Sequence, residues 1–334
     1  MTLRGGLTLA VVLATTSLAA CDKKADAPAP PPPAADAATP DAAPAPARTP
    51  HVINTGEPVD GEATLKAPAQ VPAGATFEID WTGPGNAADY IDIVPRGYTK
   101  ASGEITYVYA KNAEIVATLA APVEPGEYDI RYLAELKDGR VVKAVTPLTV
   151  TPLTVTLDAP PTTATSGEPL SIKWTGPNYK GDYIDIVPRG FAPASGEITY
   201  AYTSDGNPSE VSAPGAAGEY DIRYVVEGSP QRRVMAKAPL TVTTAPAALT
   251  APLKARKGAE VAVKWTGPGR KGDYIDIVPK GFANTSGELD YFYTSTSAAG
   301  SLKAPDKAGD YEIRYVLEAP GGRQVLTRVP LKVE

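Results

Sequence analysis

The chain has 334 residues, a formal net charge of −6, one cysteine and one histidine. A lone cysteine excludes a framework of internal disulfides, and an acidic balance without a dominant basic tract argues against nucleic acid as the main partner. The histidine, His51, follows Pro50 in a proline-rich stretch. We expect it to be solvated rather than to bind a ligand.

Residues 1–20 have the features of a secretory signal. Arg4 precedes an apolar stretch from Leu7 to Ala20 that is too short for a comfortable membrane span. The sequence Leu18-Ala19-Ala20-Cys21 resembles the lipobox of bacterial lipoproteins. The resemblance implies that Cys21 is acylated and anchors the chain in the bacterial cell envelope, at the periplasmic face of the inner membrane or at the outer membrane. The alternative is an ordinary signal peptide that is cleaved near Cys21.

Residues 21–61 are expected to form a disordered linker after the lipidated cysteine. The run from Ala27 to Pro33 and the later Ala-Pro pairs favour extended polyproline II geometry and cannot build a core. At about 3.1 Å per residue, roughly 40 such residues reach on the order of 100 Å from the membrane. The alternative is a leader whose length has no function.

Three copies of one unit follow the linker. Four motifs recur in the same order: Trp-Thr-Gly-Pro from Trp81, Trp174 and Trp265; Asp-Tyr-Ile-Asp-Ile-Val-Pro from Asp89, Asp182 and Asp273; Ser-Gly-Glu from Ser102, Ser195 and Ser286; and a tyrosine-rich segment from Gly126, Gly218 and Gly309. Units of about 90 residues are whole domains rather than solenoid repeats. We place them at 62–151, 152–243 and 244–334.

Within a unit, apolar residues alternate with polar ones. Phe77 and Ile79 alternate with Glu78 and Asp80 before Trp81. This period of two is typical of strands with one buried and one wet face, and the tryptophans are expected in the core. In the first unit we predict strands over 64–67, 75–82, 88–95, 104–110, 114–120, 126–135 and 140–150, and no helix. The fold class is therefore all-β, with three tandem β-sandwiches.

The early tryptophan and the tyrosine-rich penultimate strand resemble fibronectin type III and related Ig-like sandwiches. The segment Gly-Glu-Tyr-Asp-Ile-Arg-Tyr from Gly126 is similar to the tyrosine corner of that family. The resemblance implies that Ile130, Ile222 and Ile313 fill core positions. The units also resemble repeats attached to bacterial proteins with a von Willebrand factor A domain. This likeness indicates which domains such repeats accompany and implies no activity.

One face of each sandwich is predicted to be a binding face. In this fold the third and sixth strands are neighbours, so Asp92 and Arg131 are expected to pair across the ladder on the exposed face beside Tyr90. Tyrosine and arginine are enriched at interfaces. The alternative is a solvated sheet. The predicted face comprises Tyr90, Asp92, Arg131, Tyr183, Asp185, Arg223, Tyr274, Asp276 and Arg314.

The third unit differs from the others in charge. Residues 247–334 contain 13 basic and 10 acidic residues, whereas 153–242 contain 7 basic and 10 acidic residues. The predicted basic patch comprises Lys254, Arg256, Lys257, Arg270 and Lys271. It would attract an anionic envelope polymer or an acidic envelope protein. The alternative is drift among solvated residues.

Catalysis is not expected. The three units contain neither cysteine nor histidine, so no Cys-His or Ser-His pair can form inside them. The acids Asp89, Asp92 and Glu104 do not predict a glycosidase or a calcium site, because alternation separates them and no loop is rich in oxygen ligands. We expect no metal and no cofactor. The sequence favours a membrane-anchored interaction or scaffold arm; the alternatives are a glycan-binding protein and, more distantly, an accessory subunit of an envelope enzyme.

Overall fold

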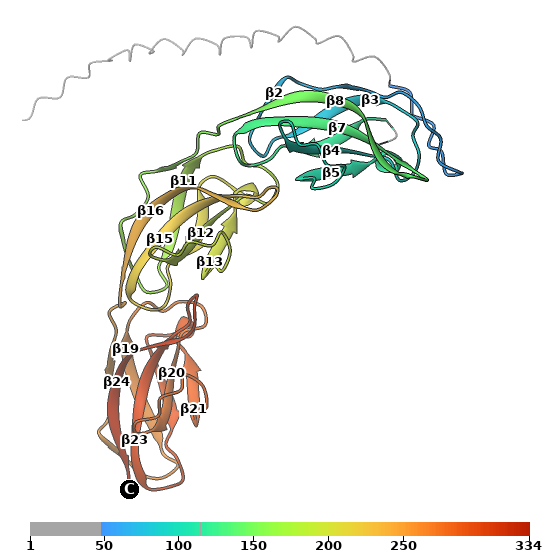
Figure 1. Ribbon diagram of the computed structural model, residues 1–334. Helices are drawn as coiled ribbons and strands as arrows, with labels where there is room; N and C mark the ends of the chain where they lie inside the picture. Colours follow the sequence, from blue (N-terminus) through green and yellow to red (C-terminus); the bar gives the residue numbers. More distant parts are fainter. Residues whose placement is uncertain (1–47, 114) are drawn as a thin grey trace, which may run out of the picture. The chain divides into compact units, whose positions relative to one another are not determined.

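The computed structural model describes residues 48–334 except Glu114, so the signal peptide 1–20, Cys21 and the linker up to residue 47 lie outside the described residues. The described chain folds as three β-sandwiches in chain order (Figure 1). Its only helical segments are three single 3-10 turns, Ala110–Asn112, Thr203–Asp205 and Thr294–Thr296. No helix in this part of the chain is long and apolar enough to cross a membrane.

The first sandwich packs a three-stranded sheet on a five-stranded one. The smaller sheet has the order β1 (Thr64–Lys66), β3 (Thr76–Thr82), β6 (Ala117–Ala120). The larger has the order β2 (Gln70–Pro72), β8 (Gly139–Thr151), β7 (Gly126–Leu136), β4 (Tyr90–Pro95), β5 (Thr106–Tyr109). All pairs are antiparallel except β2 with β8.

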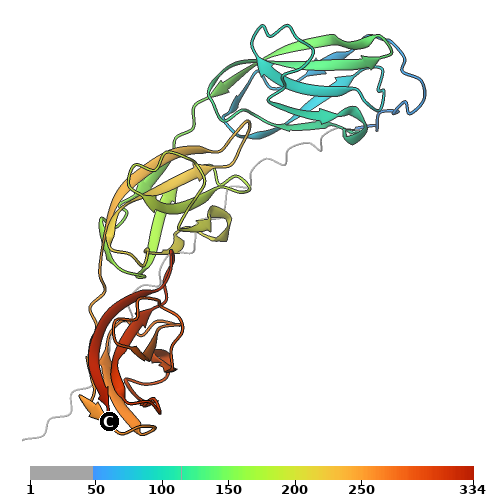
Figure 2. The same cartoon turned by 60° about the horizontal axis from the view of Figure 1, so that its bottom comes forward.

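The other two sandwiches repeat this topology. Figure 2 shows the three sandwiches from a second direction. The second consists of β9 (Thr156–Asp158), β11 (Pro169–Thr175) and β14 (Ser209–Ser212), opposite β10 (Thr163–Thr165), β16 (Arg233–Thr243), β15 (Gly218–Val226), β12 (Tyr183–Pro188) and β13 (Thr199–Tyr202). The third consists of β17 (Ala248–Thr250), β19 (Glu260–Thr266) and β22 (Ala299–Lys303), opposite β18 (Lys254–Ala255), β24 (Gln324–Val333), β23 (Gly309–Leu317), β20 (Tyr274–Pro279) and β21 (Asp290–Tyr293).

All seven strands predicted in the first unit are present, with ends that differ by a few residues. The short strand β2 was not predicted, because three residues that contain Pro72 carry too little alternation to be recognised. It pairs with the end of β8 and extends the larger sheet by one strand. The fold class is confirmed: the described chain is all-β, with three tandem sandwiches of Ig-like or fibronectin-like type.

The cores form where alternation predicts them. Strand β3 buries every second residue, and Trp81 and Trp174 are buried, whereas Trp265 is half-buried. The tyrosine corners are confirmed: the hydroxyls of Tyr128, Tyr220 and Tyr311 each donate to the backbone carbonyl four residues earlier, at 2.8, 2.8 and 3.0 Å. Ile130, Ile222 and Ile313 are fully buried. Each sandwich has its own hydrophobic cluster.

The end of the predicted linker belongs to the first sandwich. Asn54 exchanges backbone hydrogen bonds with Gly85 and Ala87, both 2.8 Å long. His51 stacks on Trp81 with ring centroids 4.0 Å apart, so it is not simply solvated. These contacts could not be predicted from the sequence, because a few contacts in a proline-rich stretch leave no periodic pattern of apolar residues. Residues 48–61 therefore cover part of the core.

Candidate functional site

The predicted cross-strand pair of aspartate and arginine forms in all three sandwiches. Asp92 lies opposite Arg131 in the ladder, and Arg131 donates from Nε to Oδ1 at 3.0 Å and from Nη2 to Oδ2 at 2.6 Å. Asp185 with Arg223 and Asp276 with Arg314 have the same two-pronged geometry. Burial raises the pKa of the three aspartates, while the hydrogen bond and charge of each arginine oppose that rise.

The prediction that this face is exposed is wrong. The tyrosine, aspartate and arginine of each predicted face are at most 3% exposed, namely Tyr90, Asp92, Arg131, Tyr183, Asp185, Arg223, Tyr274, Asp276 and Arg314. Alternation indicated a second face for β4, β12 and β20 but could not show what covers it. These side chains are therefore structural rather than a contact surface.

The connection between β4 and β5, and its two counterparts, covers that face. We call residues 96–105, 189–198 and 280–289 the covering loops. In the second sandwich Arg223 Nη1 donates to the carbonyls of Phe191 at 3.3 Å and Pro193 at 2.8 Å, and the Tyr183 hydroxyl donates to that of Ala194 at 2.7 Å. Gly196 of the Ser-Gly-Glu motif has φ of 94°, and a Cβ there would lie 3.0 Å from the Phe191 ring. A glycine at this position therefore allows the loop to fold back against Phe191.

A second buried aspartate fixes the turn after the tryptophan motif. Asp89 accepts hydrogen bonds from the Tyr132 hydroxyl at 2.7 Å and from the backbone N–H groups of Asn86 and Glu135 at 3.0 and 2.9 Å. Asp182 and Asp273 do the same in their sandwiches. A buried carboxylate with three donors is satisfied and has no free oxygen for chemistry. The structure thus gives these acids a structural role.

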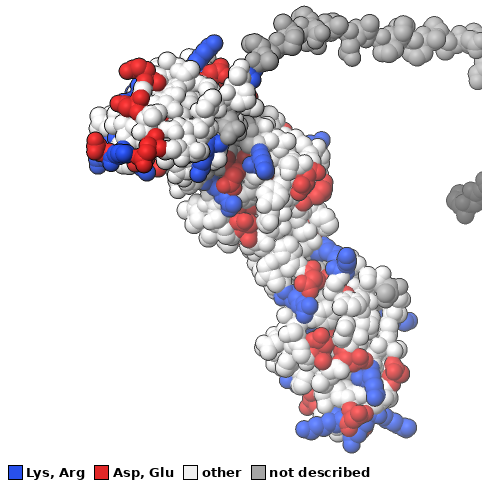
Figure 3. Space-filling view, turned by 90° about the vertical axis from the view of Figure 1, so that its right-hand side faces the viewer, with Lys and Arg blue, Asp and Glu red and all other residues white. Residues whose placement is uncertain are grey.

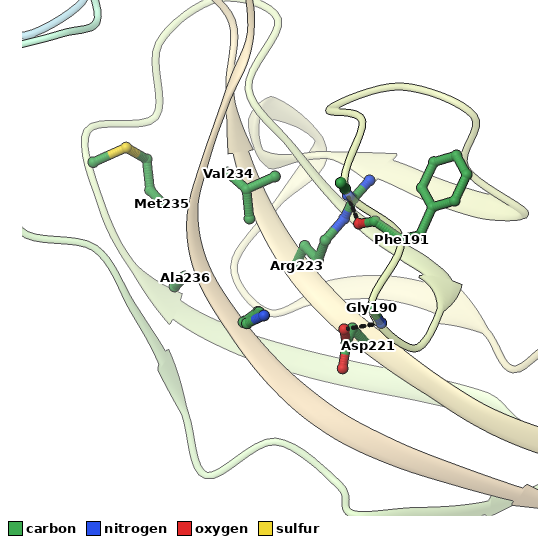
Figure 4. A pocket seen from close by; sticks show the side chains of 9 residues that line it. Gly190, Phe191, Asp221, Arg223, Val234, Met235 and Ala236 are labelled. Carbon is green, nitrogen blue, oxygen red and sulfur yellow. Dashed lines mark hydrogen bonds between the residues drawn. The ribbon is translucent and has the colours of Figure 1, made fainter.

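A cavity of about 450 Å³ lies beside the covering loop of the second sandwich (Figure 4). Two of its charged side chains are engaged in the fold: Arg223 bonds Asp185 and the covering loop, and Asp221 accepts the Gly190 N–H at 2.9 Å. Val234, Met235 and Ala236 supply its apolar wall. The exposed Lys237 completes the lining. One additional charged side chain does not make the set of converging polar groups that orients a ligand in a typical site.

Exposed tyrosines lie instead on the strand after each covering loop, at the edge of the larger sheet. We call the pairs Tyr107 with Tyr109, Tyr200 with Tyr202, and Tyr291 with Tyr293 the tyrosine edges. Within a pair the ring centroids are 5.4 to 5.5 Å apart and the rings nearly perpendicular. Five of the six are exposed, Tyr200 and Tyr202 by 49% and 43%, whereas Tyr109 is half-buried. The first tyrosine of each pair also packs edge-on against the buried Tyr90, Tyr183 or Tyr274.

The tyrosine edges were not predicted, although the sequence contains a signal for them. Each Ser-Gly-Glu motif is followed by Tyr-Val-Tyr, Tyr-Ala-Tyr or Tyr-Phe-Tyr, and the period of two places both tyrosines on the face away from Val108, Ala201 or Phe292. The middle residues pack on the cores. The tyrosines therefore had to face outward.

The predicted basic patch is divided between the two ends of the third sandwich. Lys254 pairs in register with Lys332 near the start of β23, whereas Arg270 and Lys271 precede β20, whose Tyr274 lies opposite Val316 at the end of β23. Nine residues of β23 separate these ends by roughly 25 Å. Lys254 also pairs with Glu334 at 2.7 Å, and Arg270 donates to the carbonyl of Ser166. Basic and acidic side chains are interspersed over the face seen in Figure 3.

No cluster of three or more histidine, cysteine, aspartate or glutamate side chains that could hold a metal ion occurs among the described residues. The buried aspartates are each bound to an arginine, a tyrosine or backbone N–H groups. Because these buried side chains are already paired, the tyrosine edges are the candidate binding groups that recur in all three sandwiches.

Comparisons with known proteins give likenesses of low similarity. No family model and no curated protein matches the chain. Among solved structures, it is similar to the FN1-FN3 domains of chicken CNTN1, with 12% identity and a TM-score of 0.24 over 83% of this chain and 98% of that one. Extracellular domains 3-5 of Drosophila OTK give 11% identity and a TM-score of 0.26 over 85% and 98%. The titin I-band fragment I67-I69 gives 13% identity and a TM-score of 0.21 over 82% and 99%. At such values the fold class rests on the sheets described above.

Proposed function

We propose that this protein is a non-catalytic, lipid-anchored interaction arm of the bacterial cell envelope. One observation carries the proposal: three sandwiches repeat the tyrosine edge, while their buried aspartates and arginines are engaged in holding the fold. Repeated tyrosine pairs beside charged groups suit binding, because tyrosine offers a large contact area and loses little conformational freedom.

The anchor is the part of the proposal that rests on sequence. The lipobox-like residues before Cys21 support acylation, and several acyl chains hold a protein firmly at about 0.8 kcal/mol per buried CH₂. The proline-rich residues after Cys21 support a spacer between the membrane and the first sandwich. The partners in this proposal are the membrane and a component of the envelope; nucleic acid is not among them. The similarity to repeats attached to von Willebrand factor A domain proteins adds no activity to it.

Fractionation tests the anchor. The Cys21→Ser chain is expected to leave the membrane fraction, whereas the unchanged chain stays there in high salt. A Cys21→Ser chain that still sediments with membranes in high salt contradicts the anchor.

Crosslinking in intact envelopes tests the interaction role. A photo-crosslinking side chain at Tyr200 is expected to capture a defined envelope component, and the same probe at Val145, which is 54% exposed, serves as the matched control. Equal capture from both positions, or capture from neither, contradicts a specific role for the tyrosine edge.

A further inference from the structure

A hollow of about 440 Å³ lies at the tyrosine edge of the second sandwich. This volume falls in the range of small-molecule sites, which combine aromatic walls with a few polar groups. Its lining comes from the turn before β12, the covering loop, β13 and the turn after β15: Lys180, Gly181, Tyr183, Glu197, Tyr200, Tyr202, Glu227 and Arg232.

The third sandwich has the same residue at all eight corresponding positions, from Lys271 and Gly272 to Glu318 and Arg323. These two sandwiches differ in net charge by six, from −3 to +3 over residues 153–242 and 247–334, so their surfaces as a whole have diverged. The first sandwich keeps the tyrosines, the glutamates and the arginine but has Ala87 and Ala88 in place of the lysine and glycine. The identity of the lining therefore stands out against the surrounding surface.

The lining has a particular chemical character. Two cationic and two carboxylate side chains give it no net charge. Arg232 stacks over Tyr183 at 5.6 Å and pairs with Glu227 at 2.6 Å, which keeps its guanidinium at the rim. Tyr200 and Tyr202 provide ring faces at right angles to each other. The wall of the hollow is thus aromatic, and its rim carries hydrogen-bonding side chains whose charges cancel.

A carboxylate oxygen at this place has no hydrogen-bond partner in any of the three sandwiches. The atoms are Glu104 Oε2, Glu197 Oε2 and Glu288 Oε2, each covered and each unpaired among the described residues. A buried polar atom without a partner costs free energy, so its threefold recurrence calls for a donor that completes the site.

We propose that the tyrosine edges of the second and third sandwiches bind a neutral saccharide. A sugar ring has C–H groups on its faces for the tyrosine rings and hydroxyls at its rim for the glutamate and the arginine. A charged polymer gains little from a lining without net charge. This inference deepens the proposed interaction function by naming the ligand class, and it rests on that function only for its cellular setting.

The test uses the full chain with Cys21→Ser, titrated by calorimetry with two neutral probes, cellotetraose and fully N-acetylated chitotetraose. We expect binding of at least one probe, with a dissociation constant that does not change with salt. The paired variant Tyr200→Ala with Tyr291→Ala is expected to bind at least about ten-fold more weakly, since truncated aromatic contacts dominate such sites. Glu197→Gln with Glu288→Gln keeps the shape and is expected to weaken binding several-fold.

Two controls make the outcome clear. Leu253→Ala removes an exposed apolar side chain, 69% exposed, away from the hollow and is expected to leave binding unchanged. Thermal unfolding of every variant shows whether the exposed substitutions leave the fold intact. Absence of binding to both probes, equal weakening by Leu253→Ala, or binding that salt abolishes overturns the saccharide assignment. If the probes fail while Tyr200 still crosslinks to an envelope protein, the ligand is a polypeptide, and the interaction arm stands without the saccharide.

Discussion

The buried ion pair of the second sandwich allows a sharp prediction of stability. Arg223→Met removes two hydrogen bonds to Asp185 and two to carbonyls of the covering loop, and it leaves the Asp185 carboxylate buried with 0% exposure. Stranding one member of a buried pair typically costs about 3–5 kcal/mol. A sandwich with an ordinary unfolding free energy of about 5–15 kcal/mol stays folded at this cost unless it starts near the low end.

The double variant Asp185→Leu with Arg223→Met separates the stranded charge from lost packing. It removes both charges, so it is expected to be more stable than Arg223→Met alone by about 1–3 kcal/mol. Full recovery is not expected, because the carbonyls of Phe191 and Pro193 still lose their donor. Arg189→Ala is the matched control: its pair with Glu219 is 2.5 Å long but 43% and 51% exposed, and such pairs contribute less than about 1 kcal/mol.

Hydrogen exchange with mass spectrometry on the full chain measures these effects sandwich by sandwich. Peptides from β12 and β15 report the opening of the second sandwich, and peptides from β4, β7, β20 and β23 serve as internal controls. An Arg223→Met effect no larger than that of Arg189→Ala would refute the reasoning. So would a double variant as unstable as the single one, because the stranded charge would then not be the cause.

The same variant has a pH signature. Burial raises the pKa of Asp185, and Arg223→Met removes the hydrogen bond and the charge that oppose this rise. A carboxyl whose folded pKa lies above its unfolded value of about 4 stabilises the fold below that value, and this contribution is lost as the pH rises through the folded pKa. The stability lost in Arg223→Met is therefore expected to return in part as the pH falls below neutrality. A deficit that stays constant down to pH 4 would argue against a buried charge.

Four further outcomes are expected. Trp174→Ala should destabilise the second sandwich by about 3–5 kcal/mol in hydrogen exchange, and unchanged exchange would show that the tryptophan is not a core residue. Tyr220→Phe should cost about 0.5–1.5 kcal/mol in urea unfolding through the lost corner hydrogen bond, whereas no change would make the corner energetically neutral. Burial raises the pKa of Tyr183 to about 12. The contribution of this tyrosine to the free energy of unfolding should therefore be fully present below about pH 10 and be lost between pH 10 and 12. A tyrosinate absorbance titration completed near pH 10 without unfolding would contradict this. If the third sandwich meets a polyanion, Arg256→Glu with Lys257→Glu should reduce salt-sensitive retention on a polyphosphate column, and unchanged retention would leave its positive charge as surface drift.

The strands were predictable because most of them bury one face. In β3, Glu78 and Asp80 are wet and Ile79 is buried, as a period of two requires. The pattern failed in β4, where Asp92 is buried as deeply as Ile91, because the covering loop closes the second face through backbone carbonyls that the side-chain pattern does not reveal. Alternation identifies two faces but does not show which of them meets water.

The candidate site was predictable only in part, for a related reason. Tyr90 and Tyr107 both lie in strands with alternating side chains, but only the second lies on the edge strand outside the covering loop. Lys254 and Lys271 were predicted to share one basic patch because they are close in sequence, but the strand register places them at opposite ends of a sheet. Prediction of such a surface requires the register as well as the pattern.

The ion pair, the aspartate-bound turn and the tyrosine corner each close within a single sandwich. An added or deleted copy would therefore break none of these three kinds of contact. Each added sandwich brings one more tyrosine edge. For a polymeric ligand, a second site on the same chain acts at an effective concentration set by the link between them, so weak sites combine into strong retention. Valency is thus a quantity that this architecture can adjust one repeat at a time.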